Sequence, residues 1–202
     1  MRIFVYIAAM FAALLSWGCK KDEDKLSAQQ TSIVRYLEST HTPRLISEEA
    51  ARESLDRNPP YYTVYNNEAY RYIATVYDEG RESRREIAEG DRAAIVFNAY
   101  VFAYSPLTNV MPYWSNRPEI IEAMEQTAGG LNPEYWSTEP LVLQAGSGDV
   151  IEGVSRALVG CREGDEVEVY MTYEAAYGSK YVGVVPKESP VAWLFTIVSV
   201  NN

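Results

Sequence analysis

Few side chains in this chain of 202 residues have the chemistry of a nucleophile, a base or a soft-metal ligand. There is one histidine, His41, and there are two cysteines, Cys19 and Cys161. Catalysis by a nucleophile and a base would need His41, which stands in the loop sequence His41-Thr42-Pro43 with no partner nearby, so we expect it to be solvated. HExxH, CxxC and paired-aspartate metal motifs are absent from the sequence, and we expect no metal and no cofactor.

Carboxylate pairs and a glycine-rich stretch are the other patterns with a possible chemistry. A glycosidase needs two carboxylates, which Glu48 with Glu49 or Glu122 with Glu125 would supply. In a chain of net charge −10, such pairs are typical of solvated helix faces. The segment 145–149 lacks the lysine of a phosphate-binding loop and predicts a turn. The excess of Asp and Glu over Lys and Arg also argues against nucleic acid as a partner, because the phosphate backbone is negatively charged.

The N-terminus predicts export and a lipid anchor. Residues 1–18 have the form of a signal peptide, with Arg2 followed by the uncharged apolar run from Ile3 to Leu15, which is short for a membrane span. The sequence before Cys19 resembles a bacterial lipobox, and residues 19–26 would be the lipidated cysteine and a charged tether. We therefore expect a bacterial cell-envelope protein, in the outer membrane with a periplasmic or surface-exposed position. Ordinary secretion, with Cys19 unmodified, is the alternative.

Helical and strand-like segments then alternate in a way that predicts an α+β fold. Residues 27–57 form a helical extension, with helices expected from Ser27 and from Ser47, and residues 58–202 form one domain. Tyrosine is abundant, at 16 copies, which favours strands and binding surfaces. Strands are expected at 61–65, 69–77, 93–104, 166–173 and 192–200, and short helices near Pro118 and at 150–158. The sheet is expected to be antiparallel and curled over the second of these helices.

Two segments of the domain lack such a pattern. Residues 78–91 are dominated by charges and are expected to be a solvated connection. Residues 105–138 are rich in proline and have no regular hydrophobic pattern, which indicates an insertion. Cys161 would be the one unmodified cysteine, and a buried, inert thiol is expected there.

A series of short motifs, in order, is more informative than any of them alone. The motifs are Gly90-Asp91 to Tyr100, Leu141 to Gly146, Val150-Ile151-Glu152-Gly153-Val154, Ala157 to Gly160, Glu163-Gly164-Asp165, Ala175-Ala176-Tyr177-Gly178, Val184-Val185-Pro186 and Ser189 to Phe195. Over about residues 78–104 and 139–200, this order resembles the FKBP-type peptidyl-prolyl cis-trans isomerases. The resemblance implies an FKBP-like fold and a cofactor-free isomerase or folding helper. Its partners would be proline-containing peptides or exported client proteins.

The resemblance also implies a set of site residues. Ile151 would offer its backbone N–H, and Tyr177 its hydroxyl, to the substrate. The apolar pocket would be lined by Phe97, Leu141, Val150, Val154, Val184, Val185 and Trp193, for which core packing is the alternative role. Such a pocket fits the reaction, because the barrier of ~18–20 kcal/mol to rotating a prolyl bond reflects its double-bond character. A dry pocket with a few fixed donors can lower this barrier without a nucleophile.

Two departures from the family pattern leave other functions open. Val154 stands where the family has a tryptophan on the pocket floor. The family's Phe-Asp pair has no evident counterpart, and the nearest candidate is the sequence Tyr113-Trp114-Ser115-Asn116. A non-catalytic peptide- or protein-binding module on the same fold is therefore an alternative. A glycan-binding surface lipoprotein is a further one, suggested by the aromatic residues Tyr61, Tyr62, Trp114 and Trp136.

Overall fold

A computed structural model describes residues 23–128, 131–132, 136–146 and 151–201 of the chain. The expected signal peptide, Cys19 and Val150 lie outside the described residues. No helix within them is long and apolar enough to span a membrane.

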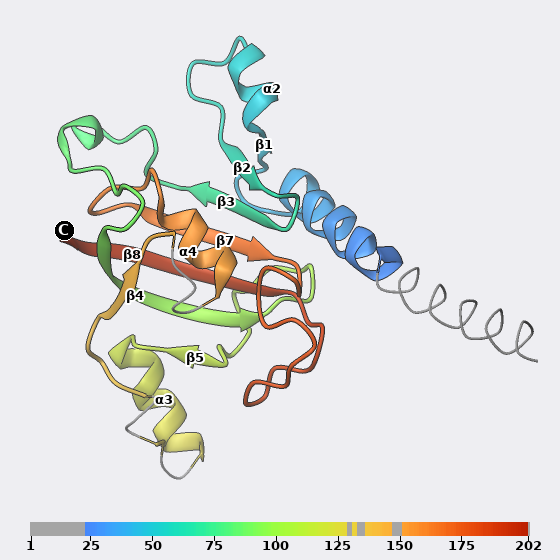
Figure 1. The fold of residues 1–202 in the computed structure, drawn as a ribbon, viewed down its shortest axis with the longest axis vertical. Coiled ribbons are helices and arrows are strands. Elements are labelled where there is room, and N and C mark those ends of the chain that lie inside the picture. The colour runs from blue at the N-terminus through green and yellow to red at the C-terminus, as the bar shows by residue number, and fades with distance from the viewer. Residues whose placement is uncertain (1–22, 129–130, 133–135, 147–150, 202) are drawn as a thin grey trace, which may run out of the picture.

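Within the described residues, eight strands form one sheet in the order β1-β2-β3-β7-β8-β4-β5, and β6 also pairs with β4 (Figure 1). The strands are β1 (Ile46–Ser47), β2 (Tyr61–Tyr65), β3 (Ala69–Ile73), β4 (Arg92–Val101), β5 (Trp114–Ser115), β6 (Leu141–Gln144), β7 (Glu166–Met171) and β8 (Val191–Asn201). The helices are residues 23–39, α2 (Glu48–Glu53), the 3₁₀ helix η1 (Arg81–Ser83), α3 (Pro118–Ala128) and α4 (Glu152–Leu158). Apart from the parallel pair β1 and β2, all strand pairs are antiparallel.

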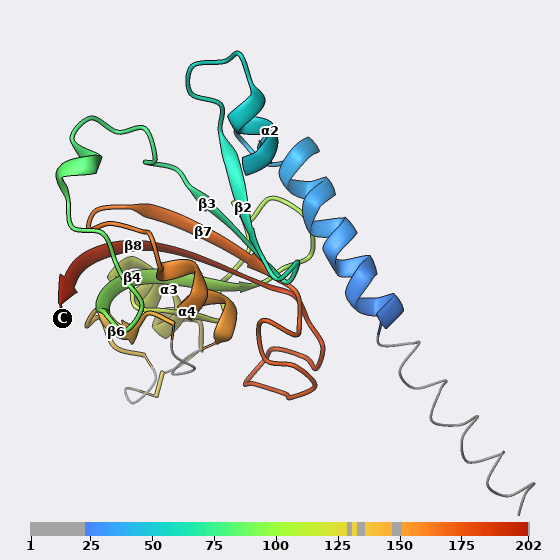
Figure 2. The same ribbon diagram turned by 45° about the horizontal axis from the view of Figure 1, so that its top comes forward.

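The α+β class and the curled sheet over one short helix are confirmed. Alternation along β7 and β8 places Val167, Val169 and Trp193 on the inner face of the sheet, in a buried cluster with α4. Figure 2 shows α4 lying against this inner face. The hairpin of β2 and β3 also forms as expected, and residues 66–68 connect the paired Tyr65 and Ala69. Asn66 and Asn67 both have positive φ and are the central residues of a turn closed by the N–H of Glu68 on the carbonyl of Tyr65.

A second buried cluster lies on the outer face of the sheet. There the helix of residues 23–39 packs Ile33, Tyr36 and Leu37 against outward-facing side chains such as Phe102 and Tyr170. The sequence placed 23–26 in a charged tether, but these residues are already helical. The structural reason lies partly in Lys25, whose ammonium pairs with Glu188 at 2.5 Å and so fixes this turn to the loop before β8. The extension is therefore a cover on the sheet.

The expectation that His41 is solvated is wrong. The side chain is buried between the N-terminal helix and the sheet, and only 5% of the residue is exposed. Its Nε2 lies 2.9 Å from Oε2 of Glu168 on β7, and its Nδ1 lies 2.5 Å from the carbonyl oxygen of Pro43. The histidine is tolerated there because both ring nitrogens have oxygen partners.

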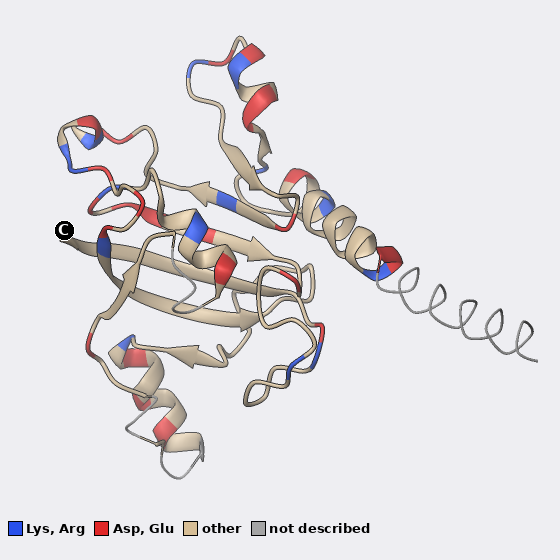
Figure 3. Ribbon diagram, viewed as in Figure 1, with Lys and Arg blue, Asp and Glu red and all other residues tan. Residues whose placement is uncertain are grey.

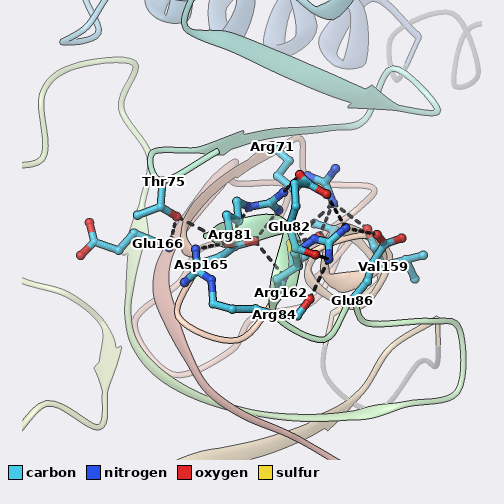
Figure 4. Close-up of polar contacts among 12 residues, drawn as sticks. Arg71, Thr75, Arg81, Glu82, Arg84, Glu86, Val159, Arg162, Asp165 and Glu166 are labelled. Carbon is cyan, nitrogen blue, oxygen red and sulfur yellow. Dashed lines mark hydrogen bonds and ion pairs between the residues drawn. The ribbon is translucent and has the colours of Figure 1, made fainter. Parts of the chain in front are cut away.

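The charged segment 78–91 is also less solvated than its composition indicates. Figure 3 shows that charged residues gather mainly in loops and helices. Yet Arg81 of η1 points inward and donates to both carboxylate oxygens of the fully buried Asp165, at 2.8 and 2.6 Å (Figure 4). The backbone N–H of Arg162 donates to the same carboxylate at 2.8 Å. A buried carboxylate needs such partners, and here they anchor the segment to the domain.

Arg71 of β3 fastens the end of α4 to the sheet. Its guanidinium donates to the carbonyl oxygens of Ala157 and Val159, at 2.8 and 2.7 Å, which satisfies carbonyls that the helix itself leaves unpaired (Figure 4). The neighbouring Cys161 is buried as expected, and its thiol donates to the carbonyl oxygen of Ala157. Burial raises the pKa of this thiol to about 11, so it stays protonated and unreactive at neutral pH.

Candidate functional site

Three side chains from distant parts of the chain meet through a line of hydrogen-bonding groups. Tyr177 lies in the loop after β7, Tyr113 directly precedes β5, and Trp193 lies on β8. The hydroxyl oxygens of Tyr113 and Tyr177 are 3.0 Å apart, and the indole N–H of Trp193 donates to the Tyr113 hydroxyl at 2.9 Å. The Tyr177 ring is only partly buried, so this line runs from the core to the surface.

Stacked and edge-on rings form an apolar base beneath these groups. Phe97 of β4 stacks on Trp193 with ring centroids 4.7 Å apart, and Trp114 meets Phe97 edge-on at 4.8 Å. Such arrangements stabilise aromatic clusters beyond the simple burial of their surface. The Tyr113 hydroxyl therefore lies beside a buried aromatic cluster, to which the indole N–H of Trp193 connects it.

Burial keeps both hydroxyls protonated. It raises the pKa of Tyr113 far above the ordinary value and raises that of Tyr177 as well, although the hydrogen bond from Tyr113 acts in the opposite direction on Tyr177. Both groups are therefore neutral hydrogen-bond donors over the physiological pH range. A neutral donor can stabilise a carbonyl oxygen without being consumed in the reaction.

A backbone donor lies at the start of α4. Ile151 is the N-cap residue of α4 and has an extended conformation, with φ −120° and ψ 139°. Its carbonyl accepts from the backbone of Val154 and Ser155, whereas its own N–H donates to no other described residue. The N–H of Gly153 donates to the carbonyl oxygen of Ala175 at 2.9 Å, which ties the start of α4 to the loop that carries Tyr177.

Most of the residues expected to form the pocket share one cluster. Phe97, Ile151, Val154, Val185 and Trp193 are buried in it, and Leu141 and Tyr177 pack against it with partial exposure. Val184 is 77% exposed on the loop before β8 and is not part of this cluster. Val150 falls outside the described residues. Full burial of Val154 and Trp193 shows that these two side chains fill the core under the site.

The insertion contributes a group that the sequence identified only as part of a weak counterpart. The Asn116 amide, expected in place of the family's carboxylate, is buried and bonds the backbone: its oxygen accepts from the N–H of Phe97 at 2.7 Å and its nitrogen donates to the carbonyls of Ile95 and Glu139. The polar group that reaches Tyr177 is instead the Tyr113 hydroxyl. No spacing in the sequence marks it, because its partners lie 64 and 80 residues away.

The aromatic residues that suggested a glycan surface are dispersed. Tyr62 is buried under the N-terminal helix and donates its hydroxyl to Glu38 at 2.9 Å, whereas Trp114 packs on Phe97 inside the site. Within the described residues, no group of three or more His, Cys, Asp or Glu side chains could hold a metal ion.

Comparison with known proteins supplies a family for this site. Residues 125–198 match the family model of the FKBP-type peptidyl-prolyl cis-trans isomerases. The chain carries an FKBP-type domain. The matched residues of the FKBP-type domain include α4, the Tyr177 loop and most of β8, and so contain Ile151, Tyr177 and Trp193. Tyr113 and β4 precede the matched region.

A solved structure and the curated proteins complete the comparison. The structure is similar to the crystal structure of the three FKBP domains of wheat FKBP73, with a TM-score of 0.48 and a sequence identity of 18%. The alignment covers 69% of this chain and 50% of the wheat chain, so this chain spans about half of that relative. No curated protein matches its sequence.

Proposed function

We propose that this protein catalyses the cis-trans isomerisation of Xaa-Pro bonds. The observation that carries the proposal is the placement of two donors, the Tyr177 hydroxyl and the Ile151 N–H, on one cluster with the aromatic base of Phe97 and Trp193. Membership of the FKBP-type family supports an isomerase-like function in general. The proposal of prolyl isomerisation in particular rests on the geometry of these groups.

The proposed mechanism needs no covalent step. Rotation about the prolyl bond breaks its conjugation, which otherwise imposes a barrier of ~18–20 kcal/mol. An apolar surface disfavours the polar, planar ground state, while fixed donors hold the carbonyl oxygens beside the bond as it twists. Ile151 would bind one carbonyl through its N–H, and Tyr177 another through its hydroxyl.

The setting of this activity is part of the proposal. The signal-peptide pattern and Cys19 support a lipid-anchored protein of the bacterial cell envelope. Its substrates would then be exported proteins that fold outside the cytoplasm, where slow prolyl isomerisation limits folding. The charge of the chain, −10, favours neutral or basic proline-containing segments over acidic ones.

Isomerisation of a short Xaa-Pro peptide, followed by NMR exchange, tests the activity. We expect the full chain, purified in a mild detergent, to accelerate exchange, and Tyr177→Phe to lower kcat/KM by about three- to tenfold, as the loss of one hydrogen bond predicts. Tyr70→Phe is the matched control, because it removes a hydroxyl bonded to Asn67 on the opposite face of the sheet. A folded protein that does not accelerate exchange would overturn the proposal.

A binding module without catalysis is the second candidate. It is favoured by Val154, which is fully buried in the core where the family has a pocket-floor tryptophan. It is also favoured by Asn116, the expected counterpart of the family's carboxylate, because its amide is bonded to the backbone of Phe97 and Ile95. In that case the peptide would bind, with chemical-shift changes near Tyr177, while exchange stayed at its uncatalysed rate. The same NMR samples distinguish the two functions.

A further inference from the structure

The order of the three hydrogen-bonding groups gives the Tyr177 hydroxyl a defined direction. We propose that Tyr113 is a positioning residue. Trp193 holds the Tyr113 hydroxyl, and this hydroxyl donates to the Tyr177 oxygen and so turns the Tyr177 proton toward the substrate. This inference rests on the proposed function of the same site. It assigns to the insertion a role in the reaction.

The direction of the line follows from its buried end. An indole nitrogen is only a donor, so Trp193 donates and Tyr113 accepts, at 2.9 Å. The proton of the Tyr113 hydroxyl then needs an acceptor, and among the described residues only the Tyr177 oxygen, at 3.0 Å, is in reach. Buried hydroxyl groups are satisfied in this way in folded proteins. Tyr113 therefore donates to Tyr177.

The proton of Tyr177 is left for the substrate. Its oxygen is occupied as the acceptor of the Tyr113 proton, and its own O–H has no acceptor among the described residues. The stronger burial of Tyr113, which raises its pKa more than that of Tyr177, agrees with Tyr113 as the donor. Each hydrogen bond in such a chain polarises the next, which makes the Tyr177 hydroxyl a better donor to a carbonyl.

The insertion is anchored so that Tyr113 cannot drift. The backbone N–H of Tyr113 donates to the carbonyl oxygen of Ala99 on β4 at 2.8 Å. Three residues later, Asn116 binds the backbone of Phe97 and Ile95 through its amide. Fixed positions on both sides of β5 hold the Tyr113 ring against Tyr177, with centroids 6.2 Å apart. Preorganised donors of this kind lose little freedom during the reaction.

A double-mutant cycle tests the coupling. We expect Tyr113→Phe to lower kcat/KM about three- to tenfold, mainly through kcat, and to have almost no further effect in a Tyr177→Phe background. Trp193→Phe, which keeps an aromatic ring and removes the N–H, should give a smaller loss of the same kind. Tyr70→Phe again controls for the loss of a hydroxyl as such. Equal, additive losses from Tyr113→Phe in both backgrounds would overturn the inference.

A spectroscopic measurement separates this inference from the proposed function. The indole N–H resonance of Trp193 should move upfield in Tyr113→Phe, because its acceptor is lost, and stay close to its original position in Tyr70→Phe. If the wild-type protein binds the peptide without catalysing exchange, the isomerase proposal alone fails. The double-mutant cycle of Tyr113 and Tyr177 is then measured with the peptide Kd in place of kcat/KM. An indole resonance that Tyr113→Phe leaves unmoved would show that the hydrogen-bond line does not exist.

Discussion

His41 and Glu168 join the N-terminal helix to the outer face of the sheet through a buried hydrogen bond of 2.9 Å. Both imidazole nitrogens face oxygens, since Nδ1 lies against the carbonyl of Pro43, and both can donate only if the ring is protonated. Three aromatic rings surround the imidazole, those of Tyr36, Tyr72 and Tyr170. The helix is thus held by a charged pair in an aromatic setting.

This pair predicts a loss of stability as the pH rises. Burial lowers the pKa of His41, but the hydrogen bonds to Glu168 and Pro43 raise it more, so the net shift is upward from 6.5. A group with a raised pKa in the folded state contributes stability that is complete below its unfolded pKa and is lost as the pH passes the folded value. Urea unfolding of the wild type should therefore show a free energy of unfolding that falls from pH 6 toward pH 9.

His41→Phe supplies the control for this pH dependence. It keeps an aromatic ring in the cavity, leaves Glu168 without its cation, and should destabilise the protein by about 1.5–3 kcal/mol at pH 6, as the loss of a charged hydrogen bond predicts. The variant should also lose much of the fall in stability above pH 6. If its pH profile parallels that of the wild type, the pair is not the titrating element.

The Arg81–Asp165 pair predicts strong destabilisation when one partner is removed. Asp165 is fully buried and accepts two hydrogen bonds from Arg81, so Arg81→Met would leave a buried charge with weaker compensation. We expect a loss of about 3–5 kcal/mol in urea unfolding. The exposed pair of Arg52 and Glu48 is the contrast, because Arg52→Ala should cost about 0.5 kcal/mol or less.

A double variant distinguishes a broken pair from a merely disturbed loop. Arg81→Met combined with Asp165→Leu removes both charges and should recover part of the stability lost by Arg81→Met alone. A double variant less stable than either single variant would show that each side chain acts through other contacts.

Local patterns predicted the central sheet well. The alternation expected over 166–173 formed a strand that ends at Met171, and the Asn66-Asn67 turn formed as expected, because strand faces and turns are encoded by neighbouring residues. The short helix after Pro118 was also confirmed, although its expected glycine stop at 129–130 lies outside the described residues.

Local sequence patterns did not predict the pairings between residues far apart in the sequence. His41 and Glu168 are 127 residues apart, and Arg81 and Asp165 are 84 apart, so nothing near either residue indicates burial. Tyr113 is a similar case, since it belongs to an insertion without periodicity and meets the site only once the sheet has formed. Family resemblance located Tyr177 and Trp193, but it could not locate a partner that the family pattern lacks.

Lipidation of Cys19 remains a prediction from the sequence. A lipidated protein should fractionate with membranes, and its N-terminal peptide should carry the mass of the lipid. Cys19→Ser should remove that mass, because the sulfur that would carry the lipid is lost. Cys161→Ser is the matched control and should leave the fractionation unchanged, since this thiol is buried. A wild-type N-terminal peptide that carries no lipid mass would contradict the prediction.

The close packing at Gly153 links the position of α4 to that of the Tyr177 loop. A Cβ atom added there would lie 2.6 Å from the sulfur of Met171 and 3.1 Å from the carbonyl oxygen of Ala175, so the Met171 side chain or α4 must shift. Because Met171 is fully buried and has little room, we expect α4 to shift away from β7 and from the Tyr177 loop. Alanine favours a helix over glycine, yet overpacking of this kind costs about 1–3 kcal/mol, and Gly153→Ala should be destabilised in urea unfolding.

The same movement should weaken substrate binding. Gly153 follows Ile151 by two residues and donates to Ala175 at 2.9 Å, so a shift of α4 changes the distance between the Ile151 N–H and the Tyr177 hydroxyl. Gly153→Ala should therefore raise KM for the Xaa-Pro peptide in the folded protein. Substitution of Met171 by alanine in the same chain makes room for the methyl group and should restore KM, although the smaller side chain lowers stability. A Gly153→Ala protein with unchanged KM would show that the two donors are positioned independently of the contact between α4 and β7.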